Sequence, residues 1–175
     1  TSNKGGSGFG KFRELPKPAI ITWQTSNTLD VFVGKHNGFN NVGVDYSRQV
    51  IYVKNDFWIV KDNFSSEGSH TFKQVWQGHY SLENQPNLMR STFSNGSGLD
   101  IFQLNTIDEI SMDGARGKQW VVASKNNQQN FSFITVLYPF STYDKRVNED
   151  VNYPSFSGWN QLTETTNFKG KKLKF

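Results

Sequence analysis

The chain has 175 residues, no cysteine, 19 basic and 15 acidic side chains, and a formal net charge of +4. This length suits one ordinary domain with its own core, and the missing cysteine excludes disulfides and thiolate chemistry. Four of the lysines lie in a basic tail at residues 168–175, FKGKKLKF, so the rest of the chain is neutral. A neutral body with a short basic tail lacks the basic stripe of nucleic-acid binders, so we expect no nucleic-acid partner.

The composition predicts an all-β protein, because 15 Phe, 6 Tyr and 5 Trp accompany only three alanines. After a Gly- and Pro-rich lead at residues 1–18, the predicted strands are AIITWQT, LDVFVG, a hairpin from Arg48 to Phe64, SHTFKQVWQGHYSL, GLDIFQLN, KQWVVASK and NFSFITVLYPF. The predicted turns are SSEG, NGSG, DGARG and NNQQN. No apolar run is long enough to cross a membrane, so no membrane partner is expected. We predict one antiparallel β-sandwich domain, thick and two-layered, over residues 1–175.

The hairpin RQVIYVKNDFWIVKDNF has two apolar runs around the pair Asn55-Asp56. A two-residue turn at this pair places Val53 opposite Trp58. One predicted face then carries Ile51, Val53, Trp58 and Val60, and the other carries Val50, Tyr52, Phe57 and Ile59. Because both faces are apolar, the hairpin should be central in the sheet and covered on both sides, by two layers of a sandwich or by one layer and a neighbouring domain. Trp58 and Ile59 should both be largely buried or lie on a domain-docking face.

Few residues form a pattern that indicates chemistry. The chain contains only the three histidines His36, His70 and His79. Their spacing does not pair them convincingly, so we expect no metal site. The acids near DGARG and in the later loop around Asp144 are typical of solvated turns. Tryptophans beside Asn and Gln side chains leave open the interpretation that the chain is a freestanding carbohydrate-binding module. A purely structural sandwich is also left open.

Three consecutive segments carry a family resemblance. These are DVFVGKHNGF, then YSR leading into QVIYVKNDFWIVKDNF, then GSHTFKQVW. In order and spacing they resemble the C-terminal domain of heparinase II/III-like polysaccharide lyases, and FITVLYPF resembles the strand that closes that domain. The chain departs from the family pattern at Asn37 and Phe39, where an acid and a tyrosine are frequent. It departs again at Gln77-Gly78, which separates Trp76 from His79.

The resemblance implies an antiparallel β-sandwich that packs against an N-terminal helical toroid missing from this chain, which would make the chain a C-terminal fragment of a larger lyase. Such lyases cleave uronic-acid-containing glycans, such as glycosaminoglycans or alginate, by β-elimination, a reaction that needs no cofactor and no metal. The catalytic groups of the family lie upstream of the matched segments, so we assign no catalytic residue here. The resemblance marks His36, Arg48, Trp76 and His79 as candidates for glycan contact, and it implies an acidic polysaccharide as the parent's ligand and a periplasmic or secreted location.

Overall fold

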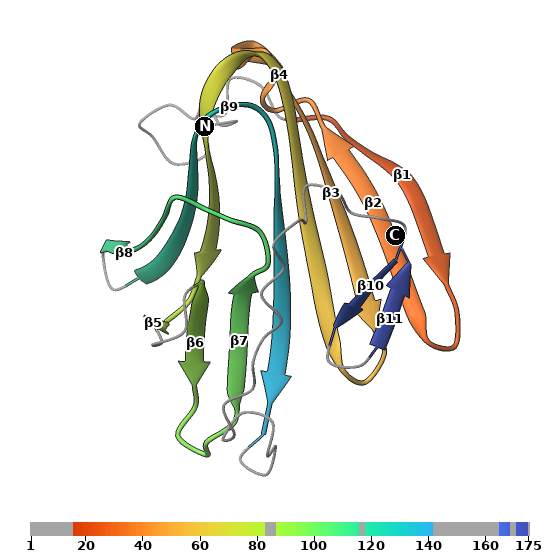
Figure 1. Cartoon of the computed structure of the whole chain (residues 1–175), viewed down its shortest axis with the longest axis vertical. Coiled ribbons are helices and arrows are strands. Elements are labelled where there is room, and N and C mark those ends of the chain that lie inside the picture. The colour runs from red at the N-terminus through yellow and green to blue at the C-terminus, as the bar shows by residue number, and fades with distance from the viewer. Residues whose placement is uncertain (1–15, 83–86, 116–117, 142–164, 169–170, 175) are drawn as a thin grey trace.

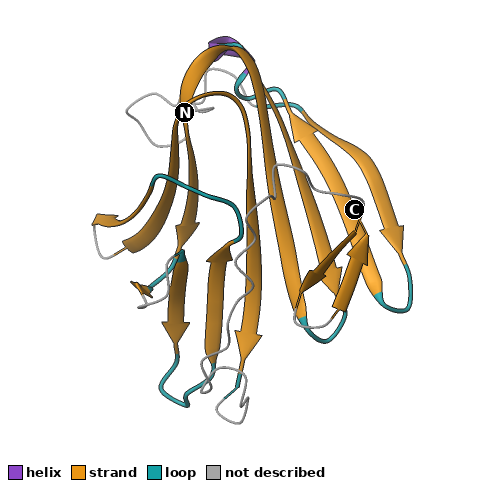
Figure 2. Ribbon diagram, viewed as in Figure 1, coloured by secondary structure: helices purple, strands orange, loops and turns teal. Residues whose placement is uncertain are grey.

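The computed structural model describes residues 16–82, 87–115, 118–141, 165–168 and 171–174. Within these residues every regular element is a strand apart from one short 3-10 turn at Asn40–Val42, and all strand pairs are antiparallel (Figures 1 and 2). The strands are β1 (Pro18–Thr25), β2 (Leu29–His36), β3 (Val44–Val53), β4 (Phe57–Gln77), β5 (Ser81–Leu82), β6 (Leu88–Thr92), β7 (Gly98–Gln103), β8 (Glu109–Ala115), β9 (Lys118–Phe140), β10 (Thr165–Phe168) and β11 (Lys171–Lys174). The predicted all-β, antiparallel fold is therefore confirmed.

Two long strands determine the shape of the main sheet, whose described strands follow the order β1-β2-β3-β4-β9-β7-β6-β5. Strand β4 has 21 residues and β9 has 23. Figure 1 shows them curving over together at one end of the molecule. The second half of β4 and the first half of β9, joined by β8, thereby form a second layer that is continuous with the first. The two layers belong to one folded sheet.

The bend in these strands overturns two predicted turns. The stretches SSEG and NNQQN lie inside β4 and β9, and the β4–β9 register is interrupted between Ser65 and Phe72. Asn127 has a φ of 53°, a left-handed conformation that asparagine tolerates better than most residues. These turn-favouring residues form a bulged bend in two paired strands instead of a chain reversal. A β-bulge interrupts the pairing locally and bends the strand, and pairing resumes beyond it.

Buried apolar residues occupy both sides of the first layer. One cluster joins the layers, since Val44 and Phe133 from the first layer pack with Phe72 and Ala123 from the second. The largest cluster lies on the opposite face of the first layer and includes Ile51, Val53, Phe57, Ile59, Ile134, Val136 and Tyr138. Alternation along the strands explains this division, because successive side chains point to opposite faces of a sheet.

The hairpin of β3 and β4 is central as predicted, since β3 lies between β2 and β4, and β4 lies between β3 and β9. Its predicted register is wrong. Val53 pairs with Phe57 and Tyr52 with Trp58, so the connection has three residues rather than two. Asn55 supplies a positive φ of 61° in this loop. The longer loop shifts the register by one residue, which moves every side chain of the second strand to the other face.

The corrected register changes the predicted burial of this hairpin. Phe57 and Ile59 are 0% and 1% exposed on the face that carries Ile51 and Val53. Trp58 is only half-buried on the other face, where its ring stacks on Tyr52 with centroids 4.7 Å apart. Burial is therefore confirmed for Ile59, whereas Trp58 is only half-buried, and its place on a domain-docking face stays a prediction.

The structure describes only parts of the two terminal segments, the lead at residues 1–18 and the basic tail at residues 168–175. Most of the lead at residues 1–18 lies outside the described residues, and β1 begins at Pro18 on the edge of the sheet, where a proline removes no ladder hydrogen bond. In the basic tail, Lys171–Lys174 form β11, which pairs with β10 in a separate two-stranded sheet. The tail therefore contains a strand.

Candidate functional site

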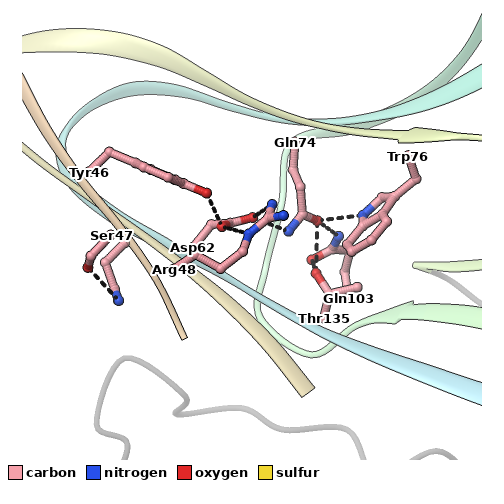
Figure 3. A network of polar contacts seen from close by, with 9 residues as sticks. Tyr46, Ser47, Arg48, Asp62, Gln74, Trp76, Gln103 and Thr135 are labelled. Carbon is pink, nitrogen blue, oxygen red and sulfur yellow. Dashed lines mark hydrogen bonds and ion pairs between the residues drawn. The ribbon is translucent and has the colours of Figure 1, made fainter. Parts of the chain in front are cut away.

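A buried carboxylate at Asp62 forms the centre of a polar network between the two layers of the sheet (Figure 3). Tyr46 donates its hydroxyl proton to Oδ1 at 2.7 Å. Arg48 donates from Nε to Oδ1 at 2.6 Å and from an Nη to Oδ2 at 2.7 Å. Gln74 donates from Nε2 to Oδ2 at 2.8 Å. Asp62 is 2% exposed, so these donors replace the water that a carboxylate otherwise requires.

Strand register explains why these groups meet. Arg48 pairs directly with Asp62 across β3 and β4, so both side chains lie on the same face. Tyr46 lies two residues from Arg48 on β3 and therefore shares that face. Gln74 comes from the second half of β4, beyond the bend, and reaches back to its own strand from the other layer.

The network continues from Gln74 into the second layer and across to β7 and β9. The Oε1 atom of Gln74 accepts from Trp76 Nε1 at 2.8 Å and from Gln103 Nε2 at 2.6 Å. The Thr135 hydroxyl lies 2.8 Å from the same oxygen and 3.1 Å from Oε1 of Gln103. Because Gln74, Gln103 and Thr135 are all buried, this chain of hydrogen bonds fixes how the layers pack.

The electrostatics of the network hold its groups in fixed charge states. Burial and the neighbouring Asp62 carboxylate raise the pKa of Tyr46 well above its usual value of 10.0. The hydrogen bond to Asp62 raises the pKa of Arg48. Tyr46 is therefore a neutral donor and Arg48 a permanent cation, and the two together stabilise one buried anion.

His36 lies at the edge of this network. Its ring packs on Tyr46 and Phe39 with centroid distances of 4.6 and 5.3 Å. The backbone N–H of Gly38 donates to its Nδ1 at 3.0 Å, so the neutral ring carries its proton on Nε2. Burial, and then the positive charge of Arg48, lower the pKa of His36. The neutral imidazole is thereby favoured.

Three of the four predicted contact residues thus gather in one place. His36 contacts Tyr46, Arg48 binds Asp62, and Trp76 reaches the same network through Gln74. His79 lies apart, exposed, with Nδ1 2.8 Å from Oε1 of Gln119. It follows Gly78, whose φ of 149° favours glycine, and this backbone turn ends β4 before His79. Contact with a glycan remains a prediction for all four.

The sequence analysis did not identify Gln74, Gln103 or Thr135 as members of a buried network. A signal was present, because Gln74 in TFKQVW and Gln103 in DIFQLN are polar residues among apolar strand neighbours. A polar residue of this kind predicts a buried hydrogen bond only if its side chain is known to point into the core.

Among the described residues, no group of three or more His, Cys, Asp or Glu side chains is placed to hold a metal ion. No described helix is long and apolar enough to span a membrane.

The fold and network define a folded antiparallel sheet domain whose layers are joined through one buried carboxylate. The chain belongs to the heparinase II/III-like, C-terminal family, whose profile matches residues 4–173. The family resemblance that the sequence suggested is therefore confirmed. A comparison with curated proteins finds no match.

Solved structures with a similar fold include the heparan sulfate lyase HepC from Pedobacter heparinus, with a TM-score of 0.62 and 21% sequence identity. The heparinase III BT4657 gene product is similar with a TM-score of 0.58 and 18% identity. In both cases the match covers 71% of this chain and 22% of the other. The chain therefore spans about a fifth of the length of these lyases, and the likeness concerns the fold.

Proposed function

We propose that this chain is the sheet domain of a lyase that cleaves uronic-acid-containing glycans by β-elimination, and that it supplies no catalytic group itself. One observation carries the proposal. The family profile covers residues 4–173, whereas the matching region is only 22% of the heparan sulfate lyase HepC. In this proposal the remainder of the parent protein includes a helical toroid that holds the catalytic groups, and the parent acts in the periplasm or outside the cell.

The chemistry of the buried network supports a structural role for its residues. β-Elimination requires a base that takes the proton from C5 of the uronate and an acid that protonates the leaving oxygen. Tyr46 is poorly suited to be that base, because burial and Asp62 raise its pKa and its hydroxyl proton is already donated to Asp62. Arg48 is likewise engaged by two hydrogen bonds to the same carboxylate.

In the parent protein, the network would hold the two layers of the sheet in a fixed relative position. A sheet that folds over itself presents two layers whose relative position depends on what joins them. Asp62 and Gln74 connect the halves of β4 on either side of the bend. The domain thereby offers a rigid surface to a neighbouring domain, and rigid support is what a catalytic cleft at a domain boundary needs.

The experiment compares the purified chain with a longer protein that contains this domain and its upstream region. Both are incubated with heparan sulfate and with alginate, and the ultraviolet absorbance of the unsaturated product is followed. We expect product from the longer protein alone, since each missing catalytic group removes a factor of about 10²–10⁴ in rate. A time-dependent rise with the isolated chain that disappears in His79→Ala or Tyr80→Phe would overturn the proposal.

A further inference from the structure

We propose that Asn37 is a site of self-modification, at which the backbone nitrogen of Gly38 attacks the Asn37 side chain and expels its amide nitrogen as ammonia. A carboxylate thereby replaces the amide. The chain has two Asn-Gly pairs, Asn37-Gly38 and Asn95-Gly96. Glycine favours this ring closure, because it has no side chain to hinder the approach of its nitrogen. The inference goes beyond the proposed function and does not depend on it.

His36 places a base on the attacking nitrogen. Its Nδ1 accepts the backbone N–H of Gly38 at 3.0 Å, within the reach of roughly 2.6–3.2 Å that a general base needs. The imidazole is held in this position by Tyr46 and Phe39, whose ring centroids lie 4.6 and 5.3 Å away. Burial, and then the positive charge of Arg48, lower the pKa of His36, so Nδ1 is unprotonated at neutral pH and able to accept a proton.

The carboxamide of Asn37 is held at its oxygen. The backbone N–H of Lys17 donates to Oδ1 at 2.7 Å. When a nucleophile adds to Cγ, negative charge develops on this oxygen, and a hydrogen-bond donor that is already in place stabilises it. Asn37 is exposed, so water reaches the product of the ring closure. The loop thus presents the base, the nucleophile and the polarised carbonyl together.

The reaction balances without any reagent other than water. A bond forms between Gly38 N and Asn37 Cγ while the N–H proton moves to Nδ1 of His36, and the π electrons of the side-chain carbonyl move onto Oδ1. The oxyanion then collapses, the Cγ–Nδ2 bond breaks, and His36 returns its proton to the leaving nitrogen, which departs as ammonia. Water opens the resulting cyclic imide at either carbonyl, which gives aspartate or isoaspartate.

The conversion would change the charge of a pocket. Asn37 lines an open cavity of about 520 Å³ together with Lys17, Lys35 and Asp45. A carboxylate at position 37 would offset one positive charge of this lining. The isoaspartate product also adds a carbon to the main chain, within the turn that the Asn40 N–H closes onto the Asn37 carbonyl at 3.1 Å. The modification therefore alters both the charge and the geometry of the loop.

The pair Asn95-Gly96 is a matched comparison within the same chain. Asn95 is also exposed, and its Oδ1 also accepts hydrogen bonds, from the Ser97 N–H at 3.0 Å and the Ser97 hydroxyl at 2.7 Å. The attacking nitrogen differs, because the Gly96 N–H donates to the carbonyl oxygen of Phe93 at 2.9 Å. A carbonyl oxygen is too weak a base to take that proton at neutral pH.

The test incubates the full 175-residue chain at neutral pH and measures conversion at both asparagines by mass spectrometry of its peptides. We expect Asn37 to convert at least about tenfold faster than Asn95, since a positioned general base contributes a factor of about 10²–10⁴ in enzymes. His36→Gln should slow conversion at Asn37 by about tenfold, because glutamine accepts the Gly38 N–H but does not take its proton. Conversion at Asn95 should stay unchanged in the same sample.

His36→Phe is the second variant, because it keeps a ring beside Phe39 and Tyr46 but carries no base. It should slow Asn37 as His36→Gln does, and urea denaturation checks that both variants remain folded. Equal rates at Asn37 and Asn95 in the unchanged chain would overturn the proposal. Faster conversion at Asn37 in a folded variant would also overturn it, because the hydrogen bond would then protect the nitrogen. Aspartate without isoaspartate would show direct hydrolysis instead of ring closure.

Discussion

Arg48 and Asp62 face each other directly across β3 and β4, and two hydrogen bonds of 2.6 and 2.7 Å join the guanidinium to the carboxylate. The pair is asymmetric in its exposure. The Asp62 side chain is 2% exposed, whereas that of Arg48 is 42% exposed. Water can therefore solvate the cation but hardly reaches the anion, and the carboxylate depends on its protein donors.

Removal of the arginine should destabilise the domain. We expect Arg48→Ala to lower the free energy of unfolding by about 2–4 kcal/mol, because it leaves a buried carboxylate with fewer donors. Lys54→Ala is the control, since Lys54 pairs with a partly exposed Asp30 at 3.0 Å and should cost about 0–1 kcal/mol. Urea denaturation measures both, and equal losses would contradict the structural role of the pair.

The conservative change Arg48→Lys separates structure from ligand binding. A lysine keeps the charge but not the two parallel hydrogen bonds, so stability should fall by an amount between those of the unchanged chain and Arg48→Ala. Intact stability with complete loss of oligosaccharide binding would instead support Arg48 as a glycan contact. Urea denaturation measures the stability, and a titration of the same sample with a uronic-acid oligosaccharide measures the binding. Together they distinguish these outcomes.

Tyr46 should make the stability of the domain sensitive to alkaline pH. Its folded pKa is raised above the ordinary 10.0, so above that pH the unfolded chain loses a proton that the folded chain keeps. The contribution of Tyr46 is therefore complete below pH 10 and is lost as pH rises toward its folded pKa, at up to about 1.4 kcal/mol per pH unit. Urea denaturation of the unchanged chain and of Tyr46→Phe between pH 8 and about 11 should show their difference shrinking above pH 10.

His36 should titrate below its ordinary value of 6.5, because burial and Arg48 both disfavour the imidazolium. A histidine with a lowered folded pKa stabilises the fold above 6.5 and loses that contribution as pH falls below it. An NMR titration of the ring protons reports the pKa directly. In Arg48→Ala the pKa should move back upward, and an unchanged midpoint would show that the two groups do not interact.

The hairpin register predicts unequal costs for neighbouring residues. Phe57→Ala should lower the free energy of unfolding by about 3–5 kcal/mol, since Phe57 is completely buried. Trp58→Ala should cost less, about 1–2 kcal/mol, because Trp58 is half-buried and mainly stacks on Tyr52. Thermal or urea denaturation measures both losses. If the two-residue turn were correct, Trp58→Ala would cost more than Phe57→Ala.

Local properties of the sequence were enough to predict the strands themselves. Aromatic and β-branched runs mark β1, β2, β7 and both halves of β9, and the hairpin between β3 and β4 follows from its polar loop. The family resemblance also follows from sequence alone, since it depends on the order and spacing of short motifs. These features can be predicted because each depends on residues that are close together in the sequence.

Tertiary structure decided which side of the sheet each residue faces. A single extra residue in the loop at Asn55 reversed the predicted faces of the second hairpin strand, since side-chain direction alternates at every position. Likewise, SSEG and NNQQN have the composition of turns, and only their pairing with each other turns them into a shared bend. The Asp62 network depends on both outcomes, because Gln74 meets Asp62 only after β4 has folded back over itself.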